Sequence, residues 1–193
     1  MAMNLPMRFV RTILLGAFFV CGCGKPVDLP KPDARIQTAE AVIDAFYSFD
    51  PERLRAVLSE APESTPRIVY YQGWAEGGNY TVVDRRPCRA ENAEQISCSI
   101  KVKDDLIAAL GTGYDVTDTF HLTFSDGKVI RVTTSSDDPP DFEEAQAWVQ
   151  RERAELIDQP CVGFFKGGPT PQECVRAMVR GFSEFAEQRH RSR

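Results

Sequence analysis

Residues 116–134, VTDTFHLTFSDGKVIRVTT, carry the pattern that decides the fold. The first half of this stretch alternates apolar and polar residues, so that Phe120, Leu122 and Phe124 share one face of a strand. Asp126-Gly127 is a hairpin turn signal, and the β-forming residues that follow it make the paired strand. The stretch predicts an antiparallel hairpin with one apolar face, which the rest of the domain has to cover.

Further strands are predicted upstream of this hairpin. Residues 96–102 alternate apolar and polar side chains, which indicates a half-buried strand. Residues 68–74, IVYYQGW, are rich in β-forming types and predict a first strand. A turn at 77–79 and a return strand at 80–83 would follow it, and residues 105–110 suggest a short helix. The middle of the chain is therefore expected to form an antiparallel sheet.

Helical patterns lie on both sides of these strands. A first helix is predicted from Thr38, with apolar residues at steps of three and four. Asp50-Pro51 starts a second helix, because Asp suits an N-cap and Pro the first helical position. An amphipathic helix follows Pro139-Pro140, and the capping box at 170–173 starts the last one. This order of elements predicts an α+β domain.

Two stretches resemble one known superfamily. Residues 41–58, AVIDAFYSFDPERLRAVL, look like the opening of the nuclear-transport-factor-2-like (NTF2-like, SnoaL-like) superfamily, and residues 120–132 resemble its closing hairpin. The resemblance spans about residues 38–150 and implies a strongly curved antiparallel sheet wrapped like a cone around helices. The residues beyond it would add a C-terminal helical layer. Members include isomerases, dehydratases, cyclases and binding or dimerisation modules, so the fold does not fix the function.

The N-terminus has the pattern of an export signal. Arg8 and Arg11 precede an apolar run at 13–20 that is too short to span a bilayer, which takes about 20 residues. The sequence Val-Cys-Gly-Cys at 20–23 resembles the lipobox of bacterial lipoproteins, which implies cleavage before Cys23 and lipidation of its thiol. The alternative is an ordinary secretory signal without a lipid.

These patterns divide the chain into four parts. They are a signal peptide at 1–22, a lipidated and Pro-rich tether at 23–37, one NTF2-like domain at 38–188 and a basic tail at 189–193. Gly24 stands where an Asp would imply inner-membrane retention in the lipoprotein family. The resemblance thus implies a periplasmic protein anchored at the outer membrane.

Charge and cysteine usage agree with export. The chain carries 28 Asp and Glu against 23 Lys and Arg, a net charge of −5, which argues against nucleic-acid binding. Four cysteines lie in the exported part and allow three pairings, of which the local one, Cys88 with Cys98 and Cys161 with Cys174, is the simplest. An oxidising compartment favours such disulfides over metal or catalytic roles.

The first of these disulfides constrains the strands around it. A simple hairpin register would place Arg86 opposite Ile100 and Asp84 opposite Val102, with charges on the apolar face. A bulge near Pro87 is therefore expected.

No motif for a known catalytic centre occurs in the chain. There is no nucleophile elbow, phosphate-binding loop, zinc-binding His-Glu-x-x-His or dinucleotide fingerprint. His121 lies between Thr119 and Thr123 on the polar face of its strand, where a histidine is usually solvated. The cysteines and histidines lack the close spacing of a metal site, so no metal or cofactor is expected and catalytic residues stay unassigned.

Asp118 is the main candidate for a side chain that acts as an acid or a base. By alternation it shares the apolar face of Phe120, where a carboxylate has a raised pKa and can act as acid or base. Enzymes of the resembled superfamily often pair a pocket carboxylate with a tyrosine, so the resemblance makes Tyr47, Tyr70 and Trp74 candidate partners. The alternative is that Asp118 ends its strand and meets water or an arginine.

Two hypotheses of function follow. The leading one is a lipid-anchored cell-envelope protein whose domain is non-catalytic and binds a small apolar ligand or an envelope protein. Its interior would be filled or nearly filled, and a homodimer through the sheet is a further option. The alternative is a small-molecule isomerase, dehydratase or hydrolase with Asp118 as general base, which requires an open cavity.

The lipobox generates a first prediction. Cys23→Ala should leave the protein uncleaved or soluble, because a triacylated cysteine binds membranes far more strongly than a single acyl chain does. Cys21→Ala is the control, since this residue would leave with the signal. Membrane fractionation and the mass of the N-terminal peptide give the readout. A wild-type protein that is soluble and carries no lipid mass would contradict the assignment.

Overall fold

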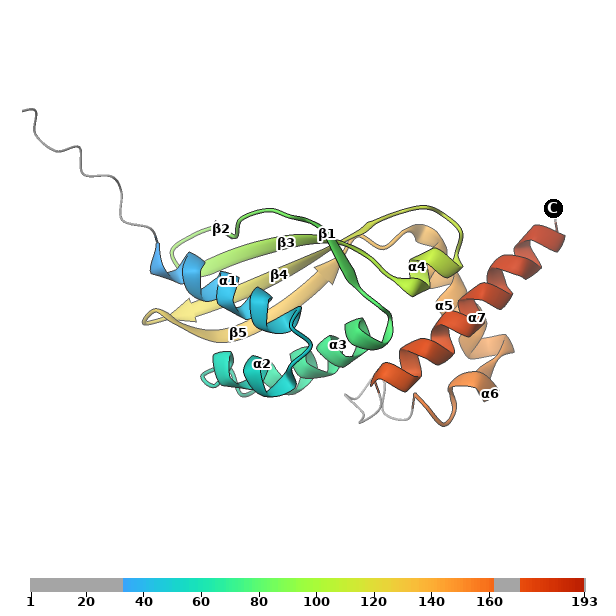
Figure 1. The fold of residues 1–193 in the computed structure, drawn as a ribbon, viewed down its shortest axis with the longest axis horizontal. Helices are drawn as coiled ribbons and strands as arrows, with labels where there is room; N and C mark the ends of the chain where they lie inside the picture. The colour runs from blue at the N-terminus through green and yellow to red at the C-terminus, as the bar shows by residue number, and fades with distance from the viewer. Residues whose placement is uncertain (1–32, 162–170, 193) are drawn as a thin grey trace, which may run out of the picture. The chain divides into compact units, whose positions relative to one another are not determined.

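The computed structural model describes residues 33–161 and 171–192, which belong to one compact unit. The expected signal peptide, the lipidation site at Cys23, most of the tether and the start of the capping box at Thr170 lie outside the described residues. Within the unit, helices cover one face of an antiparallel sheet, so the α+β class is confirmed (Figure 1).

The sheet has five strands around the predicted hairpin. Their bounds are β1 Thr81–Arg85, β2 Arg89–Ala90, β3 Gln95–Lys103, β4 Val116–Ser125 and β5 Lys128–Ser136. The order is β1-β3-β4-β5, with β2 also paired to β3, and all pairs are antiparallel. Asp126 and Gly127 have positive φ angles of 49° and 76°, as a tight hairpin turn requires. The predicted strands at 80–83, 96–102 and 116–134 are therefore confirmed.

Seven helices are described around this sheet. They are α1 Ala34–Phe46, α2 Pro51–Val57, α3 Thr65–Gly77, α4 Asp105–Ala109, α5 Pro140–Glu152, α6 Ala154–Ile157 and α7 Pro171–Arg191. The predicted N-cap at Asp50 is confirmed, because its carboxylate accepts from the backbone N–H of Glu52 at 3.0 Å. The first helix starts at Ala34 rather than Thr38, since Asp33 caps it by accepting from the N–H of Arg35 at 2.9 Å.

The predicted strand at 68–74 is wrong, because these residues form the centre of α3. Ile68, Gln72 and Ala75 recur at steps of four and three, and all three are buried. The side-chain amide of Gln72 donates to the carbonyls of Ala45 and Phe46, both at 3.0 Å, at the C-terminal end of α1. Tertiary contacts therefore outweigh the β propensity of this segment.

The expected register next to the first disulfide is also corrected. Arg85, not Arg86, lies opposite Ile100, and the irregularity falls between Val82 and Asp84 rather than near Pro87. Arg85 reaches α1 and forms ion pairs with Glu40 and with Asp44, the latter at 2.5 Å. The charge at this position is thus neutralised at the edge of the sheet instead of facing the core.

The strong curvature implied by the resemblance is not found, because the sheet is not strongly curled (Figure 1). Strand interiors need bulges or glycines to bend sharply. The four long strands contain no glycine, and the described pairings show two register irregularities, one in β1 and one at Thr123/Phe124 of the hairpin. The sheet therefore forms a layer with helices on one side.

The apolar face of β4 is buried as predicted. Phe120 and Phe46 of α1 are both 0% exposed, with ring centroids 4.8 Å apart, so the space between α1 and the sheet is filled. The opposite face carries Thr119, His121 and Thr123, and His121 Nε2 lies 3.1 Å from Ser135 Oγ. His121 therefore belongs to a polar, solvent-facing surface.

The last three helices form the added C-terminal layer. α7 packs against α3, α4 and α5. Both local disulfides are present, Cys88–Cys98 in the sheet and Cys161–Cys174 at the start of α7. The expected basic tail is corrected, because α7 continues through Arg191 and Arg189 lies 2.8 Å from Asp141 of α5.

The contact between α3 and α7 generates a second prediction. A Cβ at Gly77 would lie 2.5 Å from the Cα of Gln172, so Gly77→Ala must push the two helices apart. We expect a loss of about 1–3 kcal/mol in the free energy of unfolding, despite the higher helix propensity of Ala. Gly78→Ala is the control, since its Cβ would meet nothing closer than 3.2 Å. Equal denaturation midpoints for the two variants would contradict this packing.

Candidate functional site

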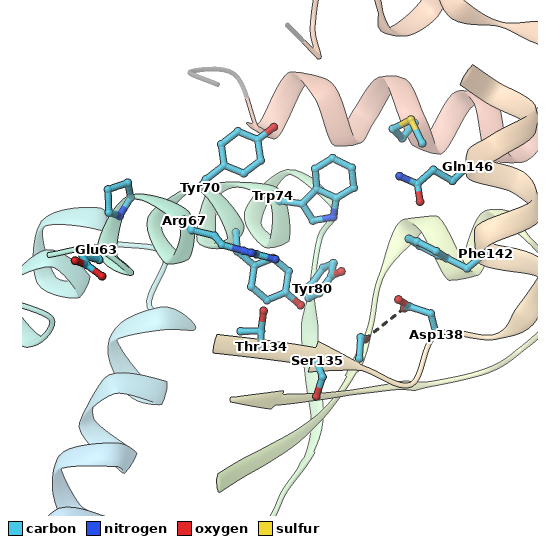
Figure 2. A pocket seen from close by; sticks show the side chains of 14 residues that line it. Glu63, Arg67, Tyr70, Trp74, Tyr80, Thr134, Ser135, Asp138, Phe142 and Gln146 are labelled. Carbon is cyan, nitrogen blue, oxygen red and sulfur yellow. Dashed lines mark hydrogen bonds between the residues drawn. The ribbon is translucent and has the colours of Figure 1, made fainter. Parts of the chain in front are cut away.

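A pocket of about 740 Å³ opens beside the filled core (Figure 2). It lies between α3, the end of β5, the start of α5 and one residue of α7. The residues that line it are Glu63, Pro66, Arg67, Tyr70, Tyr71, Trp74, Tyr80, Thr134, Ser135, Ser136, Asp138, Phe142, Gln146 and Met178. The expected filled interior is thus corrected: the space under β4 is filled, but α3 does not close against the end of β5.

The walls of the pocket are aromatic. Tyr70, Tyr71 and Trp74 come from successive turns of α3, while Tyr80 precedes β1 and Phe142 lies on α5. The rings of Tyr71 and Tyr80 pack edge to face, with centroids 6.3 Å apart. Because α3 is a helix and not a strand, three of its large side chains reach the same space.

Asp118 lies directly beneath this pocket and is 1% exposed. Its carboxylate accepts from Ser136 Oγ at 3.1 Å, from Tyr47 Oη at 3.4 Å and from the hydroxyl of Tyr71. Ser136 is also its cross-strand neighbour on β5. Since Ser136 and Tyr71 line the pocket and Asp118 does not, these two side chains separate the carboxylate from the open space.

The expected site residues therefore divide into two groups. The structure brings Tyr47 to Asp118, as the sequence analysis proposed, but Tyr47 does not line the pocket. Tyr70 and Trp74 line the pocket and are not among the groups that hydrogen-bond Asp118. Tyr71 and Ser136, which connect the two groups, were not anticipated.

Burial dominates the electrostatics of this region. It raises the pKa of Asp118 to about 6, and the negative charge of Asp138 acts in the same direction, while the hydrogen bonds from Tyr71, Ser136 and Tyr47 oppose the shift. Burial and the nearby carboxylate raise the pKa of Tyr47 and of Tyr71, so both hydroxyls stay protonated and act as donors.

Two further carboxylates were missed by the sequence analysis. Asp138 lines the pocket and lies 3.3 Å from Ser136 Oγ, and burial raises its pKa. Asp104 is the N-cap of α4, where it accepts from the N–H of Ile107 at 3.0 Å, and burial raises its pKa to about 6. Both precede predicted helices, which is the signal that could have identified them as capping or helix-entry acids.

No cationic side chain compensates these acids within residues 33–161 and 171–192. The ion pairs there include none of Asp104, Asp118 and Asp138. Burial raises the pKa of Tyr80, and the negative charges of Asp104, Asp118 and Asp138 act in the same direction, so all three acids lie close to this wall of the pocket. Arg67 and Glu63 also line the pocket, and both are exposed residues at the N-terminal end of α3. The inner part of the pocket is consequently negative.

The described residues contain no group of three His, Cys, Asp or Glu side chains that could hold a metal ion. Among the described helices, none is long and apolar enough to cross a membrane.

Comparisons with known proteins identify no family for the chain. No family model matches the chain, and no curated protein does. Among solved structures, the chain is similar to a de novo designed β-sheet protein solved by NMR, with 11% identity and a TM-score of 0.38. That match covers 55% of this chain and 88% of the designed one.

Asp118 generates a third prediction. Its folded-state pKa of about 6 lies above the reference value of 3.8, so the folded state binds the proton more tightly than the unfolded state. The favourable contribution is therefore present below about pH 4 and is lost as the pH rises through about 6. Asp118→Asn should gain on the order of 2–3 kcal/mol relative to wild type between pH 4 and pH 8.

Urea denaturation of both proteins across this range measures the effect. Asp126→Asn is the control, because Asp126 lies in the exposed hairpin turn and its positive φ of 49° suits Asn. A difference between Asp118→Asn and wild type that does not change with pH would show that Asp118 ionises normally.

Proposed function

We propose that the chain is an exported, lipid-anchored cell-envelope protein whose domain binds a small ligand without catalysing a reaction. The observation that carries the proposal is the pocket of about 740 Å³ between α3 and β5, which five aromatic rings line. Its size lies within the range of small-molecule sites, about 300–1,000 Å³, and it combines apolar walls with a few polar groups.

The compartment is supported by the two disulfides. Cys88–Cys98 and Cys161–Cys174 fit an oxidising, exported environment. Lipidation at Cys23 and a periplasmic position at the outer membrane are the finer parts of the proposal, and they rest on the signal pattern alone.

Binding is favoured over catalysis by the position of the candidate base. A general base must reach the proton it removes, directly or through one water. Asp118 is 1% exposed and lies behind Ser136 and Tyr71, so a ligand in the pocket does not contact it. His121 lies on the opposite face of the sheet. The base named in the enzyme alternative, Asp118, thus does not face the site.

A relation to the NTF2-like superfamily remains part of the proposal. It is supported by the order of the elements from α1 to the β4–β5 hairpin and by the Asp118–Tyr47 pair beneath a pocket. It is not supported by the curvature of the sheet. The polar open face with Thr119, His121 and Thr123 leaves the sheet available to an envelope protein or a second copy.

A ligand screen tests the binding function and is the fourth prediction. Small aromatic and apolar compounds should raise the melting temperature of the mature protein, because a ligand that binds only the folded state stabilises it. Tyr70→Ala and Phe142→Ala should weaken the response, since both remove pocket walls. Tyr114→Ala is the matched control, because Tyr114 is 42% exposed and lies outside the pocket.

The response must follow the pocket variants to support the function. A compound that stabilises wild type and all three variants equally binds elsewhere. If no compound in the panel gives a shift that Tyr70→Ala or Phe142→Ala reduces, the pocket is not the binding site.

A further inference from the structure

We propose that the ligand of this pocket is an organic cation, an ammonium or guanidinium group attached to an apolar body. This inference rests on the proposed function of the pocket as a ligand site and names the class of ligand. The hydrogen bonds, the charges and the aromatic rings at the inner end of the pocket, where α3, β5 and α5 meet, favour such a ligand.

Two carboxylates at the inner end of the pocket share one serine hydroxyl as a hydrogen-bond donor. Ser136 Oγ lies 3.1 Å from Asp118 Oδ1 and 3.3 Å from Asp138 Oδ1, and a serine hydroxyl has one proton to donate. Ser136 therefore satisfies one carboxylate at a time. Asp118 has further donors in Tyr47 and Tyr71, whereas the side-chain hydrogen bond that opposes the raised pKa of Asp138 comes from Ser136. A ligand that brings an N–H group or a positive charge would complement Asp138.

The charges around this point have the same sign. Asp137 and Glu143 add negative charge around Asp138, and Asp104 lies close enough to feel the charges of Asp118 and Asp138. Arg67 of α3 is the cation that lines the pocket, and it is exposed. An anionic ligand that entered fully would face uncompensated acids, whereas a cation would be attracted.

The aromatic walls suit the same ligand. Trp74, Tyr80 and Phe142 face the space that Asp138 also borders (Figure 2). A cation held over such ring faces gains from the ring quadrupoles, most at Trp, and the gain increases where water is excluded. The rings also cover the apolar body of the ligand. A strongly hydrated inorganic ion lacks that body, so the combination selects organic cations.

Three probes of similar shape test the inference, which is the fifth prediction. They are benzyltrimethylammonium, its neutral isostere neopentylbenzene and the anion benzenesulfonate, titrated into the full mature chain at pH 8. Intrinsic tryptophan fluorescence and thermal shift measure binding. We expect the cation to bind at least tenfold more tightly than the isostere, and the anion to bind most weakly. At pH 5 the preference for the cation should shrink, because Asp118, whose pKa is about 6, then loses most of its negative charge.

Matched variants locate the effect. Asp138→Asn should reduce the preference for the cation severalfold, while Asp126→Asn, in the exposed hairpin turn, should leave it unchanged. Phe142→Leu keeps apolar volume but removes a ring, so it should weaken the cation more than the isostere. This second variant keeps the test decisive if Asp138→Asn fails to fold, which circular dichroism would show.

The outcomes separate this inference from the function on which it rests. Equal binding of the cation and the isostere, both lost in Tyr70→Ala, would overturn the cation and leave the pocket as an apolar ligand site. Preferential binding of the anion would overturn it as well. Binding of none of the three probes at millimolar concentration would also overturn the cation class, while the broader ligand screen decides the function itself.

Discussion

The apolar face of β4 contains a carboxyl group, and the site depends on how its neighbours accommodate it. Asp118 lies two residues from Phe120, in a row where the other inward-facing side chains are apolar. An ionised carboxylate in such a place needs hydrogen bonds to be tolerated. Three elements supply them: α1 through Tyr47, α3 through Tyr71 and β5 through Ser136. All three elements thus place a hydrogen-bond donor next to the same buried carboxyl group.

The position of α3 decides whether open space remains next to that group. Gln72 ties α3 to the C-terminal carbonyls of α1, and Gly73 and Gly77 allow close packing against Pro171 and Gln172 of α7. Contacts with α1 and with α7 therefore fix the position of α3. Its aromatic side chains cannot move down onto the end of β5, and the gap between them becomes the pocket. The pocket follows from fixed packing on both sides and not from a missing side chain in the core.

Local patterns predicted the parts of this arrangement that depend on one element. Period-two alternation placed Asp118 on the buried face of β4, and close spacing gave both disulfides. The pattern at 68–74 failed, because β-forming side chains outnumbered the weaker four- and three-residue spacing of Ile68, Gln72 and Ala75. Once that helix was taken for a strand, the pocket could not be predicted. Its walls come from α3, β5 and α5, whose relative positions no single stretch of sequence specifies.

The buried acids near the site, Asp104 and Asp118, differ in how far a structural role accounts for their burial. Asp104 has a structural role as the N-cap of α4, which explains its burial. Asp118 instead accepts from Tyr47, Tyr71 and Ser136, and an amide side chain could accept hydrogen bonds in its place without the cost of an ionised group in the core. Perturbed carboxylates of this kind occur most often at functional sites. Asp118 is shielded by Ser136 and Tyr71. In the proposed function it would act on a ligand through those hydroxyls and through its negative charge, as a positioning residue for Ser136, which also lies 3.3 Å from Asp138.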